Sequence, residues 1–220
     1  ACKYVILVGS ENGSTLPFAN QFQEQLLKAG ETVYITELNK YDTFNKAEHI
    51  IVMTATYGEG EAPANANVFL ERLKTIKQGE DVSYSVVGFG ALAYPDFCKF
   101  AIDVDQALAL QFKQELPVFT INDKSVETFQ EWINLWNKTR KLPIAISQQK
   151  LAVKPKLNHI ITVVDKTIAE TQLDNTFLIT LKTNINKFKS GDLLAIYPEN
   201  NYRERLYSIG KVNNNIQLSV

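Results

Sequence analysis

At 220 residues and 45% apolar content, the chain is long enough for one large domain or two modest ones, with ample material for a core. No apolar run approaches the ~20 residues of a membrane-spanning helix, and there is no signal-like segment. Only Cys2 and Cys98 occur, too few and too far apart for a disulfide framework or a metal site. This favours a cytoplasmic protein, or one at the cytoplasmic face of a membrane if an anchor precedes Ala1.

The formal net charge of −1 is divided unevenly along the chain. Residues 1–150 carry 18 acidic and 14 basic side chains, whereas residues 151–220 carry 6 acidic and 9 basic ones. An acidic first part argues against nucleic-acid binding there, because it offers no stripe that would neutralise phosphates. It suits docking to a basic partner protein.

The first strand and helix enclose a loop rich in small polar residues. Tyr4–Val8 reads as a buried strand, Gly9–Thr15 as the loop, and Leu16–Ala29 as a helix that stops at Gly30. Backbone N–H groups, hydroxyls and the helix dipole converge in such a loop, which makes it a candidate phosphate site. The alternative is an ordinary strand-to-helix turn.

The next strand-to-helix unit is the most distinctive of the chain. Residues 31–37 alternate like a second strand, and residues 38–46 connect it to the apolar strand 49–53. The loop 54–65 follows, with Tyr57, two glycines and a proline, and residues 66–77 show the apolar spacing of a helix. A tight acidic surface turn is the alternative interpretation of this loop.

Two more strands complete a predicted sheet. Residues 84–90 form a fourth strand that ends in the loop 91–97, which contains Tyr94. A helix is expected over 98–111, a fifth strand over 116–121, and a last amphipathic helix over 126–140. Strand and helix thus alternate along residues 1–141, which indicates an α/β fold with a doubly wound parallel sheet.

The loops after strands one, three and four lie at one edge of such a sheet. In the flavodoxin-like strand order 2-1-3-4-5, the ligand crevice lies between strands one and three. One loop suits a single phosphate, and the other two offer Tyr57 and Tyr94. A flat ring held between two aromatic side chains and tethered by one phosphate describes FMN. Each tyrosine taken alone is more often a surface or packing residue.

The motifs resemble those of the diflavin reductases, a family that includes sulfite reductase flavoproteins, NADPH–haemoprotein reductases and the reductase half of nitric oxide synthases. The similarity is carried by Gly9–Gly13, Thr54–Ala66 and Gly90–Cys98. It implies that the phosphate is bound by Ser10, Glu11, Asn12, Gly13, Ser14 and Thr15, and the ring and its rim by Ala55, Thr56, Tyr57, Gly58, Gly60, Gly90, Ala91, Tyr94, Phe97, Cys98 and Asp123.

The sequence departs from the family pattern at a few positions. Asn12 stands where the family has threonine, which keeps a hydrogen-bonding side chain, and residues 91–93 are less polar than usual. Cys98 has a second interpretation as a small buried apolar residue.

The composition changes after residue 141. Residues 142–156 read as a linker, and residues 157–220 as part of an antiparallel barrel. Its strands are expected at 158–165, 176–182, 193–197, 205–209 and 216–220. The run 213–215 reads as a hairpin turn or as a polar tip.

Two segments of this second part are similar to the FAD-binding segments of the same family. They are Ser190–Asn200 and Arg205–Ser208, and they imply that Arg205, Tyr207 and Ser208 contact FAD. Arg205 and Tyr207 would share one face of a strand. The family's helical connecting domain is absent between them, and the chain stops before its NADPH domain, so we expect a fragment of a larger reductase.

The expected function is therefore electron transfer in a diflavin reductase, from NADPH through FAD and FMN to a haem or iron–sulfur partner that docks on the acidic first domain. The alternatives are a simple electron carrier and a flavin-free interaction domain. The acceptor is not specified by the sequence.

Overall fold

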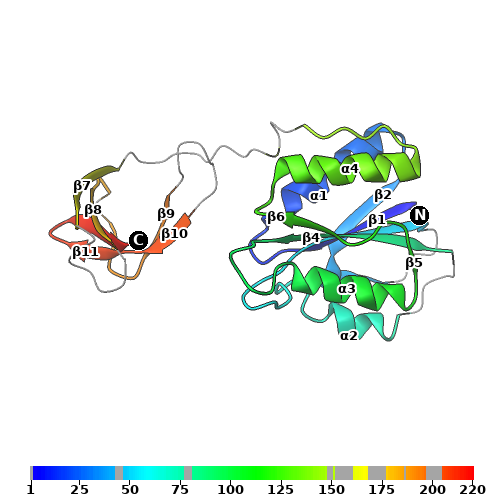
Figure 1. The fold of residues 1–220 in the computed structure, drawn as a ribbon, viewed down its shortest axis with the longest axis horizontal. Helices are drawn as coiled ribbons and strands as arrows, with labels where there is room; N and C mark the ends of the chain where they lie inside the picture. The colour runs from blue at the N-terminus through cyan, green and yellow to red at the C-terminus, as the bar shows by residue number, and fades with distance from the viewer. Residues whose placement is uncertain are drawn as a thin grey trace. The chain divides into compact units, whose positions relative to one another are not determined.

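The computed structural model describes residues 2–42, 47–76, 81–147, 151, 161–167, 177–185, 187–196 and 205–220 (Figure 1). The chain divides into two compact units, residues 1–151 and 152–220. The predicted boundaries at residues 141 and 157 stay predictions.

The first unit is built on a parallel sheet whose strand order is β2-β1-β3-β4-β5, which confirms the predicted order. The strands are β1 (Tyr4–Gly9), β2 (Val33–Glu37), β3 (His49–Ala55), β4 (Ser83–Gly90), β5 (Lys113–Gln114) and β6 (Phe119–Asn122). Both β5 and β6 pair with β4, so two short segments share the fifth position of the sheet.

Helices cover both faces of this sheet. They are α1 (Leu16–Lys28), the short 3₁₀ turn η1 (Leu38–Lys40), α2 (Phe69–Leu73), α3 (Lys99–Ala109) and α4 (Val126–Arg140). Figure 1 shows α1 and α4 on one face and α2 and α3 on the other. The side chains of β1 alternate between the two resulting cores: Tyr4, Ile6 and Val8 enter one, and Val5 and Leu7 enter the other.

Two predicted elements of this unit were wrong in extent. The helix expected over 66–77 is shortened to Phe69–Leu73, because the residues before it are held in turns by the side chain of Asn39. The fifth strand, expected over 116–121, begins only at Phe119. Pro117 lies between β5 and β6 and has no N–H for a ladder bond, so it interrupts the pairing of this segment with β4.

The described strands of the second unit are all antiparallel. A four-stranded sheet has the order β11-β12-β8-β7, and β9 pairs with β10. Their bounds are β7 Thr162–Lys166, β8 Leu178–Lys182, β9 Leu193–Ile196, β10 Arg205–Ser208, β11 Gly210–Val212 and β12 Asn215–Ser219. The predicted strand residues 158–160, 176 and 197 lie outside the described residues. Closure of these sheets into a barrel stays a prediction.

The predicted turn at residues 213–215 joins β11 to β12. Asn213 and Asn214 have φ of 47° and 63°. Positive φ at both central residues is what a two-residue hairpin turn of type I′ requires. Asparagine tolerates this conformation better than most residues. The hairpin interpretation is therefore confirmed, although the short strand β11 was not predicted.

The two central strands approach each other closely where they end. Gly9, the last residue of β1, is paired with Thr54 of β3. A side chain on Gly9 would collide with the hydroxyl of Thr54, which is itself fully buried. This glycine lets the loops after β1 and β3 leave the sheet side by side.

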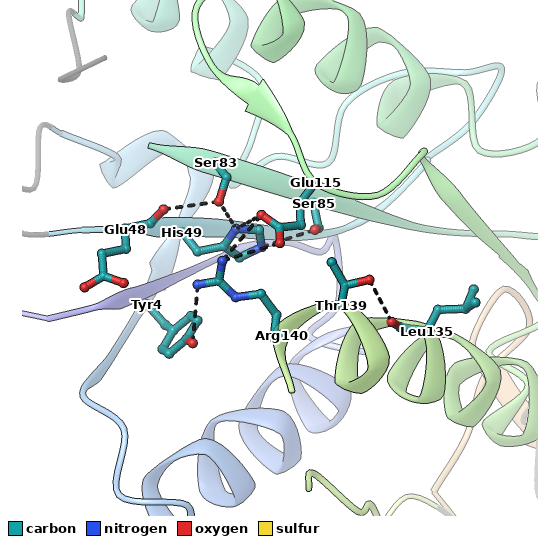
Figure 2. Close-up of polar contacts among 9 residues, drawn as sticks. All are labelled: Tyr4, Glu48, His49, Ser83, Ser85, Glu115, Leu135, Thr139 and Arg140. Atoms are coloured by element: carbon teal, nitrogen blue, oxygen red, sulfur yellow. Dashed lines mark hydrogen bonds and ion pairs between the residues drawn. The ribbon is translucent and has the colours of Figure 1, made fainter. Parts of the chain in front are cut away.

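A polar cluster is buried at the opposite edge, where the strands begin (Figure 2). The ring of His49 is fully buried, with Nδ1 2.6 Å from the Ser83 hydroxyl and Nε2 3.1 Å from that of Ser85. The Ser83 hydroxyl donates to the carbonyl of Glu48 at 3.2 Å, so its oxygen accepts from Nδ1–H. This pattern assigns the neutral tautomer with its proton on Nδ1.

Arg140 and Glu115 complete this cluster. The Arg140 guanidinium lies 3.4 Å from the Glu115 carboxylate and 3.4 Å from the Tyr4 hydroxyl, and that carboxylate is 3.8 Å from Nδ1 of His49. Burial, and then the charge of Arg140, lower the pKa of His49 to about 3. His49 therefore stays uncharged in the folded protein at neutral and mildly acidic pH.

We predict that His49 makes the first unit less stable as the pH falls below 6.5. An unfolded histidine gains its proton near pH 6.5, whereas the folded one stays neutral down to about pH 3. The unfolded state thus binds more protons in this window, and each pH unit of acidification removes about 1.4 kcal/mol of stability, or about 2 kcal/mol by pH 5. Urea unfolding followed by tryptophan fluorescence measures this, because Trp132 and Trp136 both belong to this core.

The comparison is between His49→Gln and His159→Gln, which removes the other histidine of the chain. The first substitution should flatten the dependence of the unfolding free energy on pH between 7 and 5, and the second should leave it unchanged. Equal slopes in all three proteins would contradict the prediction.

Candidate functional site

Loops from four strands meet at the carboxyl edge of the sheet. The loop after β3 is tied to β4 by the Thr56 N–H, which donates to the Phe89 carbonyl at 3.1 Å. The turn after β6 is tied to the end of β4 by the Asp123 N–H, which donates to the Gly90 carbonyl at 2.8 Å. The predicted site residues of the first unit are therefore gathered at this edge.

The loop after β1, residues 10–15, is closed by its own side chains. The Ser10 hydroxyl oxygen accepts from the Thr15 N–H at 3.3 Å, and the Asn12 side chain accepts from the Ser14 N–H at 3.3 Å. Gly13 has a φ of +77° and open space where a Cβ would stand. Within the described part of the chain, the N–H groups of Glu11, Asn12 and Gly13 meet no acceptor.

Thr15 gives this loop an unused hydrogen-bonding group. Its hydroxyl is fully buried and has no partner among the residues that the structure describes. Thr15 is also the residue before α1, whose first turn carries no acidic side chain and no side-chain cap. Free N–H groups, a buried hydroxyl and a positive helix end all favour an anion. The residues present thus fit the phosphate of FMN.

The loop after β3 presents Tyr57 on a closed turn. The Tyr57 carbonyl accepts from the N–H groups of Gly60 and Glu61 at 3.1 and 2.8 Å, and the Tyr57 N–H donates to the Glu61 carbonyl at 2.9 Å. The ring nevertheless stays 55% exposed. A rigid turn that leaves an aromatic side chain in solvent is suited to stacking on a flat ligand.

Gly58 makes this turn possible. Its φ is +52°, and a Cβ there would meet the carboxylate of Glu61. That carboxylate accepts from the Glu59 N–H at 2.6 Å, so it is held inside the turn. A side chain at position 58 would therefore strain the backbone and displace Glu61.

The loop after β4 presents the second aromatic side chain. Tyr94 is 63% exposed, and its N–H donates to the Ala91 carbonyl at 3.0 Å. The Leu92 N–H donates to the side chain of Asn122 at 2.9 Å, which ties the loop to the end of β6. Phe97 is half-buried. Tyr57 and Tyr94 thus stand on neighbouring loops of one edge, both available to a ligand.

The loops after β3 and β4 also touch each other. A Cβ on Gly60, whose φ is +101°, would lie 3.1 Å from side-chain atoms of Asp96 and of Lys99. A side chain at position 60 would strain the backbone and press on these two neighbours. The Tyr57 loop and the Tyr94 loop are therefore packed closely together near Gly60.

Cys98 directly follows the Tyr94 loop and lies against the end of β4. It is fully buried in a left-handed conformation with φ of 54°, and its sulfur would be 2.9 Å from a Cβ on Gly90. Burial raises the pKa of the thiol to about 11. This environment agrees with the second interpretation of Cys98, a packing residue, and the predicted contact with a cofactor stays untested.

Asn39 and Asn65 were missed as site residues. The Asn65 side-chain oxygen accepts from the Ser10 N–H at 2.7 Å, and Asn39 holds the segment around Asn65 in place. A cavity of about 390 Å³ opens beside them, and it is lined by Val8, Ser10, Glu11, Gly13, Leu16, Ile35, Thr36, Glu37, Ala64 and Asn65. The partners are far apart in sequence, so no local pattern indicates them.

Arg205, Tyr207 and Ser208 belong to the second unit, on β10. Arg205 is paired with Ile196, and Tyr207 with Leu194, so alternation puts Arg205 and Tyr207 on the same face of the strand. Tyr207 is half-buried against the small core of this unit, and the other two are exposed. Their role toward FAD stays a prediction.

None of the described helices has both the length and the apolar character that crossing a membrane would require.

Comparison with known proteins supports the motif-based resemblance. Residues 6–141 match the family model described as flavodoxin. A flavodoxin of Streptococcus pneumoniae TIGR4 superposes with a TM-score of 0.55 at 26% identity, over 63% of this chain and 97% of that one. The first unit therefore corresponds to nearly a whole flavodoxin.

Two curated relatives are much longer. The sulfite reductase [NADPH] flavoprotein alpha-component of Photobacterium profundum is 33% identical over 113 residues, which is 50% of this chain and 19% of that protein. The pyruvate dehydrogenase [NADP(+)] of Euglena gracilis is 25% identical over 222 residues, 89% of this chain and 12% of that protein. The chain thus spans about a fifth or less of their length.

We predict that Gly58→Ala destabilises the folded protein more than Gly30→Ala does. Both glycines have positive φ, which costs a residue with a Cβ about 1–2 kcal/mol, but Gly30 has no atom within 4 Å of that Cβ. Gly58→Ala must also displace the Glu61 carboxylate. Denaturant unfolding measures the difference, and combining Gly58→Ala with Glu61→Ala should bring the loss near that of Gly30→Ala. Equal losses in the two single variants would contradict this account.

Proposed function

Because the chain belongs to the flavodoxin family, we propose that its first unit holds FMN and transfers electrons as part of a diflavin-type oxidoreductase. The observation that carries the proposal is one sheet edge with three features. They are the unpartnered buried hydroxyl of Thr15 and the exposed rings of Tyr57 and Tyr94. A phosphate and a flat aromatic ring on one ligand would satisfy all three.

Different loops would bind the phosphate and the ring of FMN. The loop 10–15 would hold the phosphate through its N–H groups and the Ser10 and Thr15 hydroxyls. Tyr57 and Tyr94 would cover the faces of the isoalloxazine ring and exclude water from it. FMN, when bound, supplies one- and two-electron redox chemistry, and the protein sets its orientation and potential.

The source of the electrons is proposed from the relatives. The names of the Photobacterium and Euglena proteins include NADPH and NADP(+), and both proteins are far longer than this chain. We propose that NADPH and FAD act before FMN in the complete protein. Arg205, Tyr207 and Ser208 would belong to the FAD site, with Arg205 pairing with the pyrophosphate.

The electron acceptor would dock at the same edge. Glu11, Glu59, Glu61 and Asp96 are exposed on the loops that carry the site. Their charge favours a basic surface on the partner, and transfer from an exposed ring needs close approach. A haem or iron–sulfur protein is the proposed acceptor, and its docking should weaken as the salt concentration rises.

We predict that the purified chain is yellow and releases FMN in equimolar amount, measured by chromatography of the flavin after heat denaturation. If the apo form is obtained, addition of FMN should restore the visible spectrum. A chain that neither contains nor takes up FMN would refute the proposal and favour a flavin-free interaction domain. NADPH oxidation by the complete protein would then separate an enzyme from a simple carrier.

We predict that Tyr94→Ala weakens FMN binding by roughly 1–3 kcal/mol, because a large ring face is lost from the contact with the flavin. Tyr94→Phe should bind nearly as well as the parent, since the ring face and not the hydroxyl makes the contact. Fluorescence titration of the apo-protein gives both affinities. A Tyr94→Ala variant that titrates like the parent would remove Tyr94 from the site.

A further inference from the structure

We propose that Asn65 is a positioning residue for the phosphate of the flavin, an inference that rests on the proposed function. Asn65 lies outside the predicted phosphate loop and follows the Tyr57 turn in sequence. It acts on the phosphate through Ser10 and not by touching it. The chemistry that it serves is recognition of a phosphate monoester.

The contact with the phosphate loop is direct. The Asn65 side-chain oxygen accepts from the Ser10 N–H at 2.7 Å, across 55 positions of sequence. Ser10 is the first residue after β1 and is buried. An N–H in such a loop would otherwise be free to turn toward the anion or toward solvent. The bond to Asn65 fixes the backbone of Ser10 in one orientation.

That orientation determines what the Ser10 hydroxyl can do. Its oxygen accepts from the Thr15 N–H at 3.3 Å, so its proton remains to be donated. The Thr15 hydroxyl is buried without a partner in the described part of the chain, and its proton is likewise unused. Two hydroxyl donors are thus held in one loop, and a phosphate offers acceptor oxygens to both.

A second bond holds the same two segments together. The Glu11 carboxylate accepts from the Ala64 N–H at 2.7 Å. The side chain of Glu11, predicted among the phosphate-binding residues, is therefore engaged in joining the loops. A carboxylate would repel a phosphate, whereas the amide of Asn65 is neutral and can stand next to the loop without that repulsion.

Asn39 supports Asn65 from the other side. Its side-chain nitrogen donates to the Ala64 carbonyl at 3.0 Å and to the Asn67 side chain at 2.9 Å, and its oxygen accepts from the Val68 N–H at 3.0 Å. Its backbone N–H donates to the Asn65 carbonyl at 3.0 Å. The segment 64–68 is thus fixed between η1 and the phosphate loop, so the Asn65 oxygen has little freedom to move.

The test compares two ligands that differ only in the phosphate. Apo-protein is titrated with FMN and with riboflavin, and flavin fluorescence reports both affinities. Asn65→Leu keeps the approximate size of the side chain and removes the acceptor. It should weaken FMN about tenfold and riboflavin less than about twofold, because one hydrogen bond that orients the phosphate loop is lost.

Asn20→Leu is the matched control, because it makes the same exchange at an exposed position of α1. Among the described residues, the Asn20 side chain makes no hydrogen bond to the segment 64–68 or to the phosphate loop. It should leave the ratio of FMN affinity to riboflavin affinity unchanged. If Asn65→Leu fails to fold by circular dichroism, Asn65→Gln serves instead, because it retains the amide and displaces the acceptor by one methylene group. It should lower the same ratio.

Several outcomes would overturn the inference. A parallel loss for both flavins would assign Asn65 to the Tyr57 turn, and an unchanged FMN affinity would leave it no role in phosphate binding. Either result requires that the parent protein binds FMN, so the proposed function would survive. A parent protein that binds neither flavin would instead refute the proposed function, and this inference with it.

Discussion

The site depends on how closely two parallel strands can approach at their carboxyl ends. β1 ends in Gly9 and β3 passes it at Thr54, where no side chain on Gly9 could fit. Parallel strands lie less than 5 Å apart, so two loops that leave them at this point are neighbours from their first residues. One carries hydroxyls and N–H groups, and the other carries an aromatic ring. Because β4 pairs with β3, a second ring follows on the next loop.

Most of the first unit could be predicted because its strands are buried on both faces. β1 and the middle of β3 are continuously apolar, and β4 adds Val86, Val87 and Phe89 after two serines. Such runs have few interpretations other than central strands. The errors have two physical causes, a distant side-chain contact and a proline. Asn39 holds residues 64–68 in turns that an apolar spacing alone would continue as a helix. For the fifth strand, local β-propensity predicted a strand that includes Pro117, but proline has no N–H to donate to the neighbouring strand.

Much of the candidate site could also be predicted from the sequence. Ser10, Thr15, Tyr57 and Tyr94 follow strands directly, so sequence position alone places them at one edge. The contribution of Asn65 could not be predicted, because two strands and two helical segments separate it from its partner Ser10 in the chain. Nor could the sequence show that Thr15 is left with an unused hydroxyl, since burial and the lack of a partner are properties of the folded chain. Polar contacts between loops depend on the three-dimensional arrangement of the chain, which local sequence patterns do not specify.

The buried thiol of Cys98, at the end of the Tyr94 loop, makes local opening at this edge of the sheet detectable by chemical modification. Thiolates react with alkylating reagents and thiols hardly do, and burial raises the pKa of Cys98 to about 11. Cys2, the other cysteine, is only half-buried. Alkylation of Cys98 therefore requires the structure around it to open, and the rate of its modification in native protein measures how often that opening occurs. The rate of Cys98 modification would thus measure motion at one wall of the crevice.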